Sequence, residues 1–260
     1  MGWFDFLKRK SCAEPPLDPG ATLEALLGQA AADPAYRPEF YRRLLLEELV
    51  VITDENPATL VPGTSIADGS TTMRIFCWED GRIPVFTTPD RIFDGEVIKH
   101  RVAYAQMKGR ALFETLPGAT LVLNPYSASG KELLPDEVVR ILAGTVLDTG
   151  QTLVAQPAAQ VLLGHPAVYP TEMVRALARL LAQQPRVVAA YLGWIHDPAG
   201  PVPPHYIFCL DVEGEMTAIA KETGFVAQQF LDKGALVDIV QADKSSLTDY
   251  FRSTKPFYER

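Results

Sequence analysis

The chain has 260 residues, of which 47% are hydrophobic and 22% are charged. These values exclude wholesale disorder and fit one large domain or two of moderate size. The formal net charge of −8 disfavours general binding to nucleic-acid phosphates. No apolar run approaches the roughly 18 residues of a membrane-spanning helix. The three cysteines, Cys12, Cys77 and Cys209, are too few and too far apart for a disulfide framework. We therefore expect a reduced, cytoplasmic α+β protein with no integral membrane contact.

Residues 1–20 are expected to form a flexible tail, because three prolines and a glycine in its second half oppose a packed element. Its segment Trp3–Lys10 combines three aromatic residues with three basic ones. A frayed end is the simpler interpretation, since isolated short helices are marginal in water. A weak docking element for a membrane surface or a partner protein is the alternative.

A first domain is expected over residues 21–148. Thr22 can cap a helix that ends at Asp33, and a strong hairpin signal stands at Asp80-Gly81. The pattern predicts helices over 22–32, 38–48, 108–114 and 135–142, one helical turn at 88–93, and strands over 49–53, 72–78, 83–87 and 120–124.

Residues 149–159 are expected to be a linker, followed by a second domain over 160–260. The pattern predicts strands over 161–163, 187–195, 206–212 and 236–240, and helices over 171–184, 215–231 and 245–250. The order βαββαβ is typical of a ferredoxin-like split βαβ sandwich. The predicted fold class is therefore α+β with two domains, each a mixed or antiparallel sheet with helices on one face.

The third strand of the second domain carries two apolar rows. Tyr206, Phe208 and Leu210 share one face of the strand, and Ile207 and Cys209 share the other. One row must pack on the helices. The other needs a cover, which the first domain, the aromatic C-terminal tail or a second protein can supply.

Familiar catalytic and ligand-binding motifs are absent from the sequence. Ser127–Lys131 suggests a phosphate loop, but Pro125 stands where the first glycine belongs, and Glu132 stands where serine or threonine belongs. His196, Asp197 and His205 suggest a metal site, but a proline-rich hairpin loop separates them without tight ligand spacing. We expect no catalytic residue, no metal and no cofactor, and hence no enzyme.

Several segments resemble the enhanced serine sensitivity (SseB-like) family. The most specific is Pro117–Pro125 (PGATLVLNP) followed by Gly130-Lys131-Glu132-Leu133. The others are Phe40–Ile52, Ile83–Thr87, Tyr169–Thr171, Ala189–Leu192 and Pro256–Tyr258. The resemblance covers about residues 22–260. It implies separate N-terminal and C-terminal domains, a link to serine sensitivity in bacteria, and an association with toxin–immunity and secretion contexts, with no established catalytic residues.

Three hypotheses for function follow. The first is a non-catalytic module that neutralises or regulates a protein partner, preferably a basic one such as a nuclease toxin, because acidic surfaces steer basic partners. The second is a regulator in serine or sulfur metabolism that acts through a small ligand or an enzyme partner. The third is an unfamiliar enzyme that uses the Asn124–Lys131 loop, which is equally well explained as a turn kept for its conformation. The oligomeric state is not predicted. The candidate partner-binding residues are Glu79, Asp80, Asn124, Tyr126, Lys131, Tyr206 and Phe208.

Overall fold

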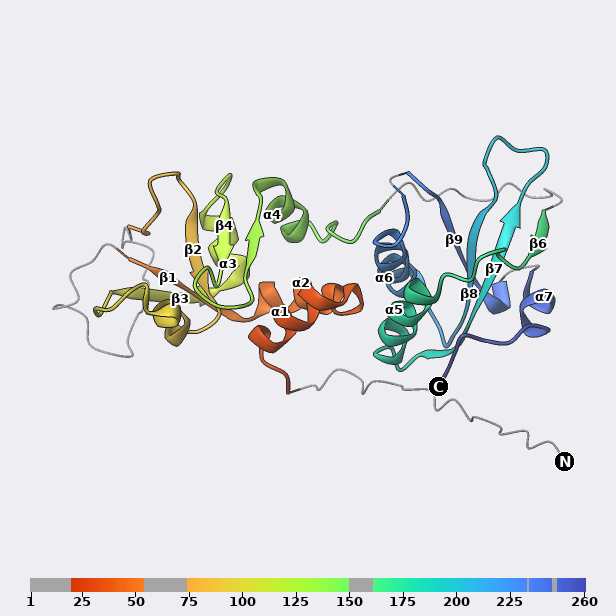
Figure 1. Cartoon of the computed structure of the whole chain (residues 1–260), viewed down its shortest axis with the longest axis horizontal. Helices are drawn as coiled ribbons and strands as arrows, with labels where there is room; N and C mark the ends of the chain where they lie inside the picture. Colours follow the sequence, from red (N-terminus) through yellow and green to blue (C-terminus); the bar gives the residue numbers. More distant parts are fainter. Residues whose placement is uncertain (1–19, 54–73, 150–160, 233, 245–246) are drawn as a thin grey trace, which may run out of the picture. The chain divides into compact units, whose positions relative to one another are not determined.

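The computed structural model describes residues 20–53, 74–149, 161–232, 234–244 and 247–260. These residues form two compact units, one between residues 21 and 149 and the other from most of residues 161–260. Two α+β domains are therefore confirmed (Figure 1). The expected tail lies outside the described residues except for Gly20, and the expected linker does so except for Thr149.

The first domain is built on a five-stranded sheet with the order β3-β1-β2-β4-β5. β2 and β4 run parallel, and the other neighbours are antiparallel. The strands are β1 (Glu48–Ile52), β2 (Ile83–Phe86), β3 (Tyr104–Lys108), β4 (Leu121–Leu123) and β5 (Lys131–Leu133). The helical elements are α1 (Leu23–Ala32), η1 (Pro34–Tyr36), α2 (Arg37–Leu46), η3 (Pro89–Glu96), α3 (Gly109–Thr115) and α4 (Pro135–Leu142).

The two faces of this sheet have different covers. Side chains alternate along β1, so Leu49 and Val51 share the face on which α3 packs. The approach is close: a Cβ on Gly109 of α3 would lie 1.9 Å from the carbonyl oxygen of Leu44 in α2, so glycine is required there. On the opposite face, a buried cluster includes Val50 and Phe86 together with residues of η3 and the segment that follows it.

The predicted hairpin in the first domain is only partly correct. A tight turn follows Trp78, whose amide donates to the carbonyl of Arg82 at 2.9 Å. The strand expected over 72–78 is wrong for its described part, because Ile75 forms only an isolated bridge with Thr53. The antiparallel neighbour of β2 is β1 instead.

The second domain has a sheet in which β7, β8 and β9 are neighbours in chain order. β6 and β10 lie along the other edge of β7, opposite its end and its beginning respectively. The strands are β6 (Leu162–Gly164), β7 (Val187–His196), β8 (His205–Val212), β9 (Val237–Gln241) and β10 (Tyr258–Glu259). The helical elements are α5 (Thr171–Ala182), α6 (Thr217–Gln228), η4 (Ala242–Lys244) and α7 (Thr248–Arg252).

The element order βαββαβ is confirmed, but the ferredoxin-like arrangement of the strands is not. A split βαβ unit has a further strand between its two parallel strands. Here β8 and β9, joined by α6, are direct parallel neighbours, and β6 pairs antiparallel with β7. In a ferredoxin-like sheet the first strand would lie between the strands that correspond to β8 and β9. Here the three-residue β6 lies at the edge of β7 instead, and β8 pairs directly with β9.

Helices α5 and α6 lie on one face of the second sheet and α7 on the other (Figure 1). Phe251 of α7 packs with Ile195, Ile207 and Cys209 in a buried cluster. Gly193 admits the Phe251 ring, because a Cβ there would lie 2.9 Å from it. The cover of the second apolar row is therefore α7, whereas Phe257 of the expected aromatic tail packs on Phe208 in the other row.

Candidate functional site

The Asn124–Lys131 loop begins at a buried residue with a structural role. Asn124 has a φ of 48°, in the left-handed region that asparagine tolerates better than most residues. Its side-chain oxygen accepts a hydrogen bond from the Thr87 amide at 2.9 Å, and its side-chain nitrogen donates to the Thr87 hydroxyl at 3.0 Å. At the other end of the loop, a Cβ on Gly130 would lie 2.9 Å from the carbonyl oxygen of Asn124. Asn124 therefore holds the loop against the end of β2.

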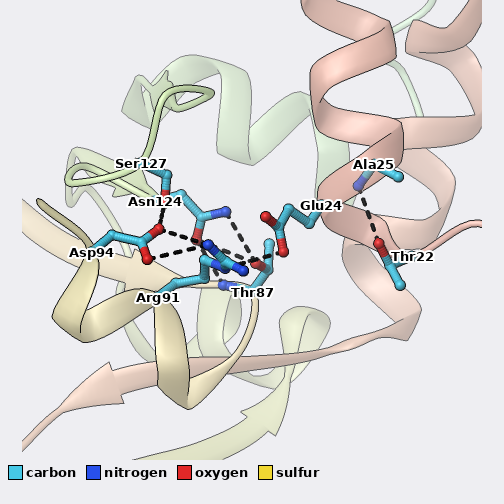
Figure 2. A network of polar contacts seen from close by, with 8 residues as sticks. All are labelled: Thr22, Glu24, Ala25, Thr87, Arg91, Asp94, Asn124 and Ser127. Carbon is cyan, nitrogen blue, oxygen red and sulfur yellow. Dashed lines mark hydrogen bonds and ion pairs between the residues drawn. The ribbon is translucent and has the colours of Figure 1, made fainter.

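Figure 2 shows a chain of polar contacts from the start of α1 to this loop. The Nε of Arg91 lies 3.1 Å from Glu24 of α1, and its Nη1 lies 2.9 Å from Asp94. Asp94 also accepts a hydrogen bond from the Ser127 hydroxyl. The hydrogen bonds from Ser127 and Arg91 hold the pKa of the Asp94 carboxyl below its ordinary value. This network fixes Ser127, and with it the neighbouring Tyr126, relative to the start of α1.

Lys131 ends the loop in a separate cluster on the helical side of the sheet. Its Nζ lies 2.9 Å from Glu137 of α4, and it stands 5.9 Å from the centre of the Tyr41 ring. The Tyr41 hydroxyl donates to the same Glu137 carboxylate at 2.7 Å. Burial first, and then this hydrogen bond, raise the pKa of Tyr41. Lys131 thus joins β5 to α4 and α2.

Partly exposed aromatic residues beside the loop define the candidate interaction site. Trp78 meets Tyr126 edge-on, with ring centroids 6.5 Å apart, and the guanidinium of Arg82 stands 5.4 Å from the centre of the Trp78 ring. Arg82 lies 2.7 Å from Asp80 on one side and 3.6 Å from Glu132 on the other. We call Trp78, Asp80, Arg82, Tyr126 and Glu132 the Trp78 surface.

The Trp78 surface packs on the core through Tyr126 and exposes charged side chains to solvent. The Tyr126 ring packs on Phe86, 5.7 Å away, within the buried cluster on this face of the sheet. The Arg82 and Asp80 side chains are 45% and 49% exposed, and Glu132 is also 49% exposed. The hydrogen bonds from Arg82 lower the pKa of Asp80, so that carboxylate stays charged. With the exposed Glu79 next to it, the surface has an excess of negative charge.

The two candidate residues in the second domain have different environments. Phe208 is fully buried and its ring meets Phe257 at a centroid distance of 5.9 Å, which makes it part of the core. Tyr206 is partly exposed and stands edge-on to Trp194 at 4.9 Å. Both residues belong to the second domain, whereas the Trp78 surface belongs to the first, so they are a separate feature.

The histidine pair does not assemble into a metal site. His205 pairs across the sheet with Ile195, so its side chain and that of the adjacent His196 point to opposite faces. Among the described residues, no group of three or more histidine, cysteine, aspartate or glutamate side chains could hold a metal ion. A shallow cavity of about 400 Å³ at the carboxyl ends of β8 and β9 is acidic, but ion pairs with Arg260 and Arg252 engage its Glu213 and Asp243.

The sequence alone did not single out three members of the Trp78 surface. Trp78, Arg82 and Glu132 come from the turn and from β5, and the sequence pattern predicted neither their proximity nor β5 itself. The available signal was the Trp78–Arg82 spacing across an Asp-Gly turn, which brings the two ends of the turn together. Glu132 approaches Arg82 because β5 lies beside β4, which in turn lies beside β2.

Comparison with known proteins gives consistent matches to one family. The family model for the SseB protein N-terminal domain matches residues 23–140, and the model for the SseB protein C-terminal domain matches residues 156–260. Protein SseB of Escherichia coli (strain K12) and that of Shigella flexneri are each 29% identical to this chain over 250 residues. These alignments cover 92% of this chain and 92% of each relative. No solved structure matches. None of the described helices has the length and apolar character of a membrane span.

Proposed function

Because both domains match, the chain belongs to the SseB family, and we propose that it is a non-catalytic module that binds a protein partner through the Trp78 surface. The observation that supports this proposal is the clustering of Trp78, Tyr126 and Arg82 at one partly exposed place. Tryptophan, tyrosine and arginine are the residue types that contribute most of the binding energy at protein interfaces.

The charges around the Trp78 surface favour a basic partner. Residues 21–149 hold 12 basic and 18 acidic side chains, a net charge of −6. At the surface itself, Asp80 and Glu132 outnumber Arg82, and the exposed Glu79 next to it adds to this excess of negative charge. Opposite charge accelerates diffusional encounter and suppresses wrong partners. A partner that presents an apolar side chain flanked by lysine or arginine fits this surface. Proteins that bind nucleic acids commonly carry such basic surfaces.

A binding role is favoured over catalysis because the charged side chains in and around the Asn124–Lys131 loop are held in ion pairs within the fold. Arg91 is held by Glu24 and Asp94, and Lys131 is held by Glu137. The Arg91–Glu24 pair joins η3 to α1 and the Lys131–Glu137 pair joins β5 to α4, whereas the Arg91–Asp94 pair lies within η3. Burial raises the pKa of the Cys209 thiol to about 11, which keeps it protonated and unreactive near neutral pH.

The test is affinity capture from native lysate, followed by binding measurements with the purified partner. Trp78→Ala should weaken binding of the captured protein by about thirtyfold, the loss typical of an interface hot spot. Val139→Ala is the matched control, because Val139 is an exposed apolar residue of α4 in the same domain. Equal binding by Trp78→Ala and wild type would show that the partner uses another surface.

A further inference from the structure

The N-terminal segment has the composition that fits the Trp78 surface. Residues Trp3–Lys10 (WFDFLKRK) hold three aromatic residues, three basic ones and one acidic one, a net charge of +2. The Trp78 surface presents partly exposed aromatic rings beside Glu79, Asp80 and Glu132. The two are complementary both in charge and in aromatic character, which supplies electrostatic attraction together with aromatic packing.

The point where the segment is attached also lies close to this surface. Thr22 caps α1, and Glu24 in the first turn of α1 contacts Arg91 at 3.1 Å. Arg91 contacts Asp94, and Asp94 accepts a hydrogen bond from Ser127, the residue after Tyr126 (Figure 2). Three consecutive contacts therefore lead from the start of α1 to the edge of the Trp78 surface. All of them lie within the first domain.

The intervening chain is long enough for the segment to reach the surface. Nine residues, 11–19, separate Lys10 from Gly20, where the described structure begins. At about 3.3–3.6 Å per residue they span up to about 32 Å, comparable with the width of a domain of this size. A tether of this length gives an effective concentration on the order of millimolar, so even a weak contact is populated.

We propose that Trp3–Lys10 docks on the Trp78 surface of its own chain and competes there with the protein partner. This inference rests on the proposed function, because the segment occupies the surface assigned to the partner. Its aromatic side chains lie against Trp78 and Tyr126, and Lys8, Arg9 and Lys10 face Glu79 and Glu132. A partner must displace the segment in order to bind.

The test uses a fluorescein-labelled peptide of residues 1–10 and fluorescence anisotropy. The peptide should bind a chain that lacks residues 1–12 at least tenfold more tightly than it binds the full chain, whose own segment already occupies the site. In the shortened chain, Trp78→Ala should weaken peptide binding at least tenfold, and Val139→Ala should leave it unchanged. Equal affinity for the full and shortened chains would overturn the proposal.

A charge exchange tests the orientation and separates this contact from its alternatives. A peptide with Lys8→Glu, Arg9→Glu and Lys10→Glu should lose binding to the shortened chain and regain it with the Glu79→Lys, Glu132→Lys variant. Failure of this rescue would overturn the docking, as would peptide binding to phosphatidylglycerol vesicles in place of the protein. A captured partner that needs Trp78 while the peptide does not bind would refute the inference and leave the proposed function standing. Peptide binding without any Trp78-dependent partner would refute the proposed function and the competition, and would leave only the docking of the segment standing.

Discussion

At the scale of single residues, Asn124 shows how one side chain supports a loop. It provides a left-handed backbone conformation and satisfies the buried amide of Thr87. Asn124→Ala loses both, and we expect it to lower the free energy of unfolding by about 2–4 kcal/mol, from an unpaired buried N–H and a strained φ. Asn124→Gly should lose less, because glycine adopts positive φ freely. Urea denaturation measures both variants, and equal losses would mean that the backbone conformation contributes nothing.

Cys209 makes the stability of the protein depend on pH. Burial, reinforced by the nearby Asp211 carboxylate, raises the pKa of the Cys209 thiol to about 11. A cysteine in an unfolded chain titrates near pH 8.5. Between about pH 8.5 and 11 the unfolded state therefore releases a proton that the folded state keeps. The stability that Cys209 contributes is complete below about pH 8.5 and is lost as the pH rises toward 11.

Alkylation with iodoacetamide tests the burial and the raised pKa of Cys209 together, because only an accessible thiolate reacts. At pH 9 the exposed Cys77 should react about two orders of magnitude faster than the fully buried Cys209. In urea the two should react at the same rate, which serves as the control. Similar rates in the folded protein would contradict the assignment of a raised pKa to Cys209.

At the scale of elements, the docking of α7 on the second sheet depends on Gly193. A Cβ there would lie 2.9 Å from the Phe251 ring and 3.1 Å from Ile207. Gly193→Ala should lower the free energy of unfolding by about 1–3 kcal/mol through overpacking. Gly164→Ala in β6 is the matched control, because a Cβ there meets no atom within 4 Å.

A second substitution identifies the cause of that loss. Phe251→Leu removes the ring against which the new methyl group packs. The double variant Gly193→Ala, Phe251→Leu should therefore be more stable than the sum of the two single losses predicts. Additive losses, measured by urea denaturation, would indicate that the Gly193 effect arises in the strand itself and not in its contact with α7.

The long elements were predictable from sequence, and the short ones were not. The residues of α5, β7 and β8 have regular apolar periods, and their bounds lie within about two residues of the prediction. β3, β5 and β10 were missed, because their pairing is set by neighbouring strands and not by a pattern of their own. The expected strand at 72–78 carried a strand-like composition, but β1 already occupies that edge of β2.

The same limit applies to the candidate site. Glu79, Asp80 and Tyr126 were selected for charge, turn position and loop membership, and they lie on or beside one surface. Asn124 was selected for loop membership and Phe208 for its place in an apolar row of a strand, but both are fully buried. Burial at such positions depends on which layer covers the strand. That cover comes from segments distant in sequence, such as the Phe257 ring that packs on Phe208.

At the scale of the whole molecule, each domain covers both faces of its own sheet. In the first domain, α3 packs on one face, and η3 with the following segment covers the other. In the second, α5 and α6 lie on one face and α7 on the other (Figure 1). The first domain has about 130 residues and the second about 100, and both are typical sizes for domains that fold alone. We therefore expect the chain to be divisible between residues 149 and 161.

Fragments 20–149 and 161–260 should each unfold cooperatively in urea, because each retains a complete two-sided core. The sum of their far-UV circular dichroism spectra should equal that of residues 20–260. The denaturation curve of residues 20–260 should equal the sum of the two fragment curves, and each transition should keep the slope of its fragment, since the slope scales with the surface that the domain exposes on unfolding. A broad, non-cooperative transition in one fragment, with a normal one in the other, would show that its core depends on the second domain, contrary to the separate cores described here.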